Sequence, residues 1–222
     1  MAGSLEDLAY NKIKVAISNG YIKKGSKLKE VSLSNSLNMS RATVKGAIKR
    51  LVYEGLAEHK PNIGASVVNP SFEEIKESYQ VRIHLEKMAI SLAIEKFGPN
   101  DFNELHDLIQ KEKKGFTAEE QAQEYEINSD FHMKIAEKSN NRVLVHYIKE
   151  LIQKTTIYLI LFDSFYHRLD MNNSSPIEHE RILQFLERKD EKKAVIAIES
   201  HLESTLSNID PHGRLPHDYL TI

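Results

Sequence analysis

The sequence after Pro70 constrains the fold most, because apolar residues recur there at helical spacing and no segment reads as a strand. Gly98-Pro99 interrupts the pattern, and Asp101 with Glu104 is expected to cap the next helix. These signals predict helices over 72–97, 101–114, 118–138, 141–168, 176–188 and 191–208. We therefore expect a mainly α protein whose larger part is an all-α bundle of about six helices.

The first 70 residues follow a different pattern. Helical spacing is present in 5–18, a short helix is expected within 29–37, and a third begins after Ser40 and stops at Gly55. The following stretch, LAEHKPNIGASVVN, reads as two short strands joined by the turn residues 61–64. We expect a first domain at 1–69, a linker at 70–71, a helical domain at 72–210 and a tail at 211–222.

Charge divides the chain in the same place. Residues 1–70 hold 11 Lys and Arg against 5 Asp and Glu, a net charge of +6, whereas the remainder carries −8. A basic first third favours a polyanionic partner, although chance segregation of surface charge is the alternative. No apolar run could span a membrane and no export signal is evident, so we expect a cytoplasmic protein. Without cysteine, a metal would need His, carboxylate, amide oxygen or water.

The segment SRATVKGAIKRLVYEGL, residues 40–56, is an amphipathic helix with an unusual outer face. Its outer positions carry small residues and cations, and no acid occurs until its end. Ala42 and Gly46 would let the helix backbone approach base edges in a major groove. An ordinary solvated helix that happens to be basic is the alternative. The buried face is expected to consist of Val44, Ala47, Ile48 and Leu51.

The cations of this helix suit different parts of DNA. Arg41, near the N-terminal end, is placed to donate two hydrogen bonds to a guanine edge. Lys45, Lys49 and Arg50 are better suited to phosphates, which add affinity with little sequence choice. Ser40 and the free N–H groups of the first turn can also hold a phosphate.

The stretch from Leu28 to Val67 resembles the winged helix-turn-helix of GntR-type bacterial transcription regulators. The matching motifs are Ser-Arg-x-x-Val-Lys-x-Ala-Ile-x-x-Leu, Glu-Gly-Leu and a wing ending Gly-x-x-Val. Thr43 and Gly46, also on the outer face, replace the family's commoner Pro and Glu, which leaves the helix more positive. The resemblance implies DNA contacts by Arg41 and Lys45 and a wing tip that approaches the minor groove at Gly64. Lys60 and Asn62 are further wing candidates.

Three histidines of the helical part point inward on three different expected helices. They are His132, with Asn128 one turn before it, His179 and His201. Neutral imidazoles with an oxygen donor suit a divalent transition metal if the helices bring them together. Taken singly, each is better interpreted as an ordinary core histidine.

This part of the chain, roughly residues 72–207, resembles the FCD ligand-binding domain of the FadR subfamily. The matching segments are QVRIHLEKMAISLAIEKF, NSDFHMKIAEKSNN and EHERILQFLERKDEKKAVIAIESHL. The resemblance implies metal ligands, with zinc or nickel as the metal, at Asn128, His132, His179 and His201. Asn128 stands where Asp is usual, and its amide oxygen lacks the negative charge, so a metal-free site is the alternative.

In this family the effector is often an organic acid. Arg82 is therefore expected to be the cation of the pocket, with an ion pair to a bundle carboxylate as the alternative. Tyr79, Tyr158 and Phe162 either line the cavity or belong to the core. We expect a homodimeric DNA-binding repressor with no catalytic residues. A metal-responsive regulator and a metal-dependent enzyme are the rival hypotheses.

Overall fold

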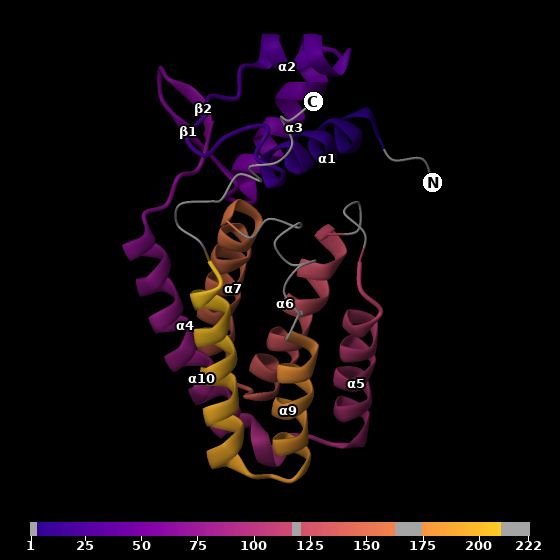
Figure 1. Cartoon of the computed structure of the whole chain (residues 1–222), viewed down its shortest axis with the longest axis vertical. Coiled ribbons are helices and arrows are strands. Elements are labelled where there is room, and N and C mark those ends of the chain that lie inside the picture. Colours follow the sequence, from indigo (N-terminus) through magenta and orange to yellow (C-terminus); the bar gives the residue numbers. More distant parts are fainter. Residues whose placement is uncertain (1–3, 117–120, 163–174, 210–222) are drawn as a thin grey trace, which may run out of the picture. The chain divides into compact units, whose positions relative to one another are not determined.

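The structure is a computed structural model that describes residues 4–116, 121–162 and 175–209. Within these residues the regular structure is helical except for one antiparallel hairpin (Figure 1). The described residues divide into two compact units: the first runs to Ser71 and also takes in residues 157–162, and the second holds residues 72–156 and 175–209. Each unit is described by itself below.

The first unit has the expected order of three helices and a hairpin. Strand pairing runs from Ala57 opposite Val67 to Lys60 opposite Gly64, and the loop before the second helix adds a bridge between Lys27 and Ser66. The elements are α1 (Leu5–Ser18), α2 (Glu30–Leu37), α3 (Arg41–Tyr53), β1 (Ala57–Lys60) and β2 (Gly64–Val67). This is the predicted winged arrangement, in which α3 packs on both α1 and α2.

The ends of α3 are set by two local signals. The Ser40 hydroxyl accepts the Thr43 backbone N–H at 3.1 Å, which satisfies one of the free donors of the first turn. After the helix, Gly55 adopts a φ of +82°, a left-handed conformation that side-chain-bearing residues rarely take. Both positions match the sequence prediction, so the exposed face of α3 has a fixed start and end.

The second unit is all helix in the residues that the structure describes. Its elements are α4 (Phe72–Ala93), the 3-10 turn η1 (Ile94–Lys96), α5 (Pro99–Lys113), α6 (Gln121–Lys138), α7 (Arg142–Phe162) as far as Thr156, α9 (Ser175–Glu187) and α10 (Glu191–Ser207). The predicted parts 118–120 and 163–168, and the tail 211–222, lie outside the described residues.

The start of α5 differs from the prediction. Asp101 was expected to cap the helix, but α5 already begins at Pro99. The Asp101 carboxylate instead reaches back from the third helical position and accepts the Gly98 N–H at 2.7 Å. Proline fits the first helical turn because its missing N–H would have no partner there.

Packing within the bundle directs several helices toward a shared interior. The α4 helix packs on α6 and α10, while α9 packs on α5 and α10. The α7 helix joins through an apolar cluster of Ala89, Ala136, Leu144, Ile148 and Ile152. No described helix is both long and apolar enough to cross a bilayer.

Candidate functional site

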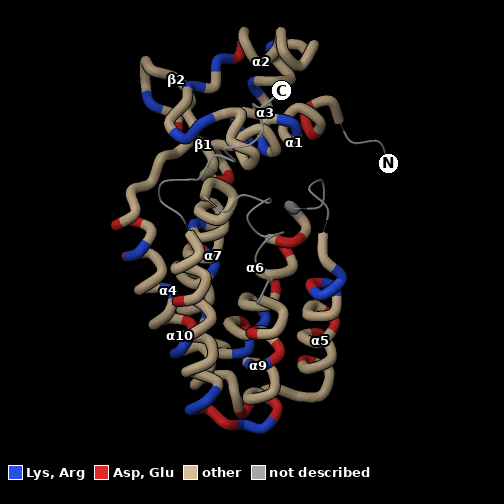
Figure 2. Tube along the Cα trace, in the orientation of Figure 1, with Lys and Arg blue, Asp and Glu red and all other residues tan. Residues whose placement is uncertain are grey.

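The outward face of α3 carries three cations that extend into solvent. Arg41, Lys45 and Lys49 are all exposed, and within the described part of the chain they form no ion pair. Figure 2 colours the Lys and Arg positions along the trace, those of α3 included. The opposite face is buried at the four positions predicted from the helical spacing, namely Val44, Ala47, Ile48 and Leu51. The helix is therefore anchored on one side and leaves a basic face on the other.

Arg50 does not belong to this free set. Its Nη1 lies 3.0 Å from Asp7 Oδ1 and its Nε 2.9 Å from Glu54 Oε1. The guanidinium also lies over the Tyr10 ring, 3.8 Å from the centroid. These contacts hold α1 against α3, so they favour a structural role for Arg50 over the phosphate contact expected from its place on the helix.

Gly46 also faces α1 rather than an open groove. A Cβ at this position would lie 2.2 Å from Oε2 of Glu6, which comes from the first turn of α1. The small residue therefore makes room for a carboxylate. This corrects two interpretations, that Gly46 serves close approach to DNA and that the helix surface there lacks an acid.

The hairpin tip is open. Asn62 and Gly64 both have positive φ angles, 63° and 94°, which turn the chain sharply between the strands. No atom lies within 4 Å of a Cβ placed at Gly64, so another molecule can approach the backbone there. Lys60, at the end of β1, pairs with Glu58 at 2.7 Å, and both side chains are largely exposed.

In the second unit, three helices bring their histidines together. His132 comes from α6, His179 from α9 and His201 from α10, and all three are buried. One ring nitrogen from each can be chosen so that all three lie within 4.8 Å of one another. The Nε2 atoms of His179 and His201 are 3.2 Å apart. The three histidines singled out in the sequence thus form one cluster, called the histidine centre below.

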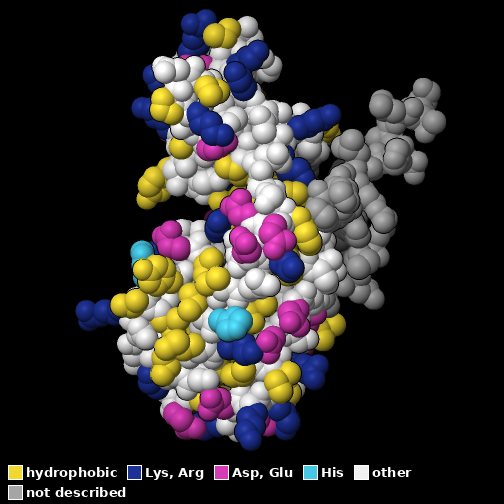
Figure 3. All heavy atoms as spheres, turned by 90° about the vertical axis from the view of Figure 1, so that its left-hand side faces the viewer, with side chains coloured by type: hydrophobic (Ala, Val, Ile, Leu, Met, Phe, Trp, Pro, Cys, Tyr) yellow, Lys and Arg dark blue, Asp and Glu magenta, His cyan; other side chains and the backbone are white. Residues whose placement is uncertain are grey.

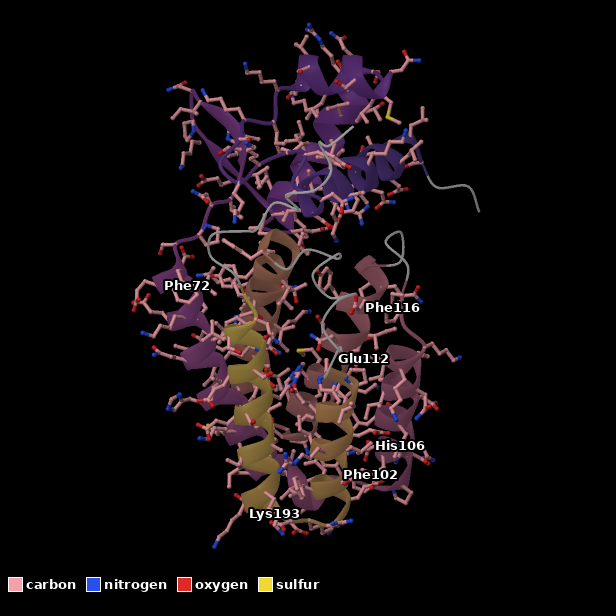
Figure 4. The ribbon with its side chains drawn as sticks, in the orientation of Figure 1. Phe72, Phe102, His106, Glu112, Phe116 and Lys193 are labelled. Carbon is pink, nitrogen blue, oxygen red and sulfur yellow. The ribbon has the colours of Figure 1, made fainter. Side chains whose placement is uncertain are left out.

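Each of these histidines is backed by a carboxylate on its other ring nitrogen. The Nδ1 atom of His132 lies 2.7 Å from Glu86 Oε2, and that of His179 lies 2.7 Å from Glu112 Oε2. The Nδ1 atom of His201 lies 2.7 Å from Glu178 Oε2. Ionised carboxylates only accept hydrogen bonds, so each Nδ1 carries the proton of a neutral ring. Figure 4 labels Glu112, which reaches from α5 toward α9. Each Nε2 is therefore left with a lone pair.

The histidine centre fits a metal ion. His132 Nε2 is buried and has no hydrogen-bond partner among the described residues, and the Nε2 atoms of His179 and His201 face one another at 3.2 Å. Two nitrogens that each bind one ion at about 2.1 Å would lie roughly 3.0–3.4 Å apart in octahedral or tetrahedral geometry. Carboxylates on the far ring nitrogen are typical of metal-binding histidines. Asn128, half-buried one turn before His132, is on the same face of α6.

The electrostatics keep the rings in the form that binds metal. Burial lowers the pKa of His132 to about 3, and burial with the neighbouring His179 lowers the pKa of His201. Burial raises the pKa of Glu112, but its hydrogen bonds with His179 and Ser175 lower it more, so this carboxyl stays ionised. His132 and His201 are thus neutral near neutral pH, and Glu112 is ionised beside them.

Arg82 lies beside this centre and is also buried. Its Nε donates to Glu86 Oε1 at 2.6 Å and its Nη1 to Thr155 Oγ1 at 2.7 Å. Its Nη2 is buried and has no hydrogen-bond partner in the part of the chain that the structure describes. The ion pair considered as an alternative is therefore present, and one donor edge remains for a ligand. Tyr79, Tyr158 and Phe162 are buried, and their place in a ligand cavity stays a prediction.

The sequence analysis missed the residues that support the histidines. Glu86 lies inside a quoted motif, four residues after Arg82, and Glu178 lies inside another, directly before His179. Their positions in these motifs were a local signal that could have identified both residues. Glu112 had no such signal, because its partner is 67 residues away. Phe131 was also missed. Its ring stacks on that of His179 with 4.1 Å between the centroids.

Two family models match the chain, and together they cover both units. Residues 5–67 match "Bacterial regulatory proteins, gntR family", and residues 77–204 match the FCD domain. The HTH-type transcriptional regulator YdhC of Bacillus subtilis is 25% identical over 193 residues, 86% of this chain and 85% of that protein. LutR of the same organism is 28% identical over 84% of this chain and 92% of its own length.

McbR of Escherichia coli is 30% identical over 141 residues, which are 64% of each chain. The solved structure of E. coli McbR/YncC has a TM-score of 0.62 at 24% identity and covers 93% of this chain and 97% of that one. A GntR regulator from Rhodococcus sp. RHA1 has a TM-score of 0.64 at 20% identity, with coverages of 92% and 96%. These structures share the fold of this chain.

Proposed function

Because the chain belongs to the GntR family of bacterial regulatory proteins and carries an FCD domain, we propose a repressor whose operator affinity is controlled by an organic acid bound beside a divalent metal. The family and the relatives above are transcription regulators rather than enzymes, so the enzyme hypothesis is set aside. Such a repressor works in the bacterial cytoplasm, where its DNA is.

The exposed cations of α3 support the DNA-binding role. Arg41 stands at the start of the helix, where its guanidinium can bond two acceptors of a guanine edge. Lys45 and Lys49 follow on the same exposed side and suit phosphates. We assign contributions at the helix start to Ser40 and Thr43, and contacts at the wing to Lys60, Asn62 and Gly64.

The single observation that carries the sensory role is the buried histidine centre, in which the three Nε2 lone pairs have no hydrogen-bond donor among the described residues. Zinc or nickel would take the Nε2 atoms of His132, His179 and His201, with the Asn128 amide oxygen as a further donor. The metal would supply a positive charge for a carboxylate ligand. Arg82 Nη2 offers that ligand a second anchor.

The central experiment is a titration of operator release. An operator is selected from random DNA with metal-free protein, and its affinity is then measured with zinc alone, with a panel of short organic acids alone, and with both. Release that requires both supports the proposal. Release by zinc alone would establish the metal-responsive alternative. The His179→Ala variant serves as the control, because it should bind the operator normally but no longer respond.

We also propose that two copies pair through the outer face of α4. Val81, Met88 and Leu92 recur along it at helical spacing and are each exposed by more than a third, and Figure 3 shows apolar side chains gathered over this side of the bundle. A second copy of the chain suits this face because two DNA-reading heads would bind a two-fold operator. Met88→Glu should yield monomers in sedimentation experiments, whereas Ile177→Glu, an exposed change on α9, should not.

A further inference from the structure

Glu86 is shared between two different partners. Its Oε1 accepts from Arg82 Nε at 2.6 Å, and its Oε2 lies 2.7 Å from His132 Nδ1. Glu112 offers an internal comparison, because it supports His179 in the same way but takes its other hydrogen bond from the hydroxyl of Ser175. Glu86 therefore links the histidine centre to a buried cation, whereas the described partners of Glu112 include none.

The chain of contacts from Arg82 through Glu86 to His132 has an open position at each end. At one end Arg82 Nη2 is a buried donor, and at the other His132 Nε2 is a buried lone pair; neither has a partner within residues 4–116, 121–162 and 175–209. All three side chains are at most 5% exposed. A donor with positive charge suits an anion and a lone pair suits a cation, so the two ends suit ligands of opposite charge.

We propose that Glu86 is a positioning residue that couples metal binding at His132 to carboxylate binding at Arg82. This inference rests on the proposed function. When a metal takes the Nε2 lone pair, the Nδ1–H of His132 becomes a stronger donor and draws the charge of Glu86 toward Oε2. Oε1 then holds Arg82 less firmly, and the guanidinium presents more positive charge to an incoming carboxylate.

The reverse step follows from thermodynamic linkage. A carboxylate at Arg82 competes with Glu86 Oε1, so Glu86 becomes a better acceptor for His132 and makes the ring a stronger metal ligand. The two ligands must then raise each other's affinity by the same factor, for which about 5- to 150-fold is typical. Operator release would respond to the joint presence of both ligands more steeply than to either one.

The test is a double titration of the full-length chain with zinc and acetate. Zinc affinity is measured by competition with a chromophoric chelator at zero and at saturating acetate, and the ratio of the two affinities is the coupling factor. The acetate affinity with and without zinc must give the same factor. We expect a factor of about tenfold or more for the wild-type chain.

Glu86→Gln and Glu112→Gln are the matched variants. Both remove one negative charge from a carboxylate behind a histidine, so any direct attraction between metal and acetate should change similarly in both. Both should lower zinc affinity by about 10- to 100-fold. The coupling factor should fall close to one in Glu86→Gln and stay near the wild-type value in Glu112→Gln.

Two outcomes separate this inference from the function on which it rests. A chain that binds no zinc would overturn both. A chain that binds zinc and acetate, but with equal coupling factors in the two variants or none in the wild type, would overturn the coupling alone. Should Glu86→Gln not fold, Glu86→Asp replaces it. Its carboxylate is one methylene too short to hold both partners, so unchanged coupling in that variant would also contradict the proposal.

Discussion

The two units place their charged side chains in opposite ways. In the first unit the cations of α3 that we assign to DNA contacts are exposed and unpaired among the described residues, as Arg41 and Lys49 illustrate. In the second unit Arg82, Glu86 and His132 are buried and bonded to one another. An exposed charge contributes little to stability and is available to a partner. A buried charge depends on its neighbours, so loss of one group disturbs the others.

The prediction with the largest expected effect compares the removal of one cation from each unit. Arg82→Met leaves Glu86 buried without its cation, and it should lower the free energy of unfolding by about 3–5 kcal/mol. Lys45→Met also replaces a cation by methionine, on the exposed face of α3, and should alter the free energy of unfolding by less than about 0.5 kcal/mol. Urea unfolding of the metal-free chain, followed by circular dichroism, measures both. Equal effects would mean that burial does not distinguish the two cations.

The exposed cations should instead differ from one another in how their loss affects DNA binding. Arg41→Ala is expected to cost about 1–3 kcal/mol on a selected operator and to relax base preference, because it reads a base edge. Lys49→Ala should weaken all sequences alike and reduce the salt slope by about one. Fluorescence anisotropy on operator and random duplexes at several salt concentrations tests this. A similar loss on both duplexes for Arg41→Ala would refute its role in base reading.

The buried histidines should make the metal-free helical unit sensitive to acid. Burial lowers the pKa of His132 to about 3, an effect that Arg82 and His201 reinforce and Glu86 opposes. The unfolded ring takes up its proton near pH 6.5, so this contribution to stability is complete above that pH and is lost as the pH falls toward 3.

Between pH 6.5 and pH 5 the loss from this ring should be about 2 kcal/mol. It can be measured as a fall in the free energy of urea unfolding. The His132→Gln variant, which cannot take up the proton, should show a correspondingly smaller fall. A pH dependence that is the same in both chains would show that His132 is not responsible.

The smallest expected effect is in the first unit. Gly46→Ala should stabilise it by up to about 1 kcal/mol, because glycine is a poor helix residue. The new methyl would displace the Glu6 carboxylate, but this side chain is exposed and can rotate away. Thermal unfolding of the two chains provides the comparison. A lower melting temperature for the variant would show that Glu6 is held more firmly than its exposure suggests.

The same contrast explains what could be predicted from the sequence. The anchored face of α3 follows from the spacing of residues on one helix, and the structure buries the four expected positions. Helical spacing also predicted that the three histidines face the interior, and the structure buries all three. It could not identify Glu112, because this residue meets His179 across 67 positions of sequence. The ion pair of Arg50 could not be predicted for the same reason, since the spacing on α3 carries no information about Asp7 on α1. The phosphate contact of Arg50 stays a prediction.

The carboxylate that lies over Gly46 has a consequence for comparing such regulators by alignment. This column usually holds Glu in the resembling family, and here it holds glycine. A negative group nevertheless occupies the space beside that position, donated by Glu6 on a different helix. A comparison of single alignment columns would record the loss of a negative charge at position 46. On the folded surface that charge is present, but it comes from a residue 40 positions earlier in the sequence. Substitutions at the two positions should therefore be interpreted as a pair.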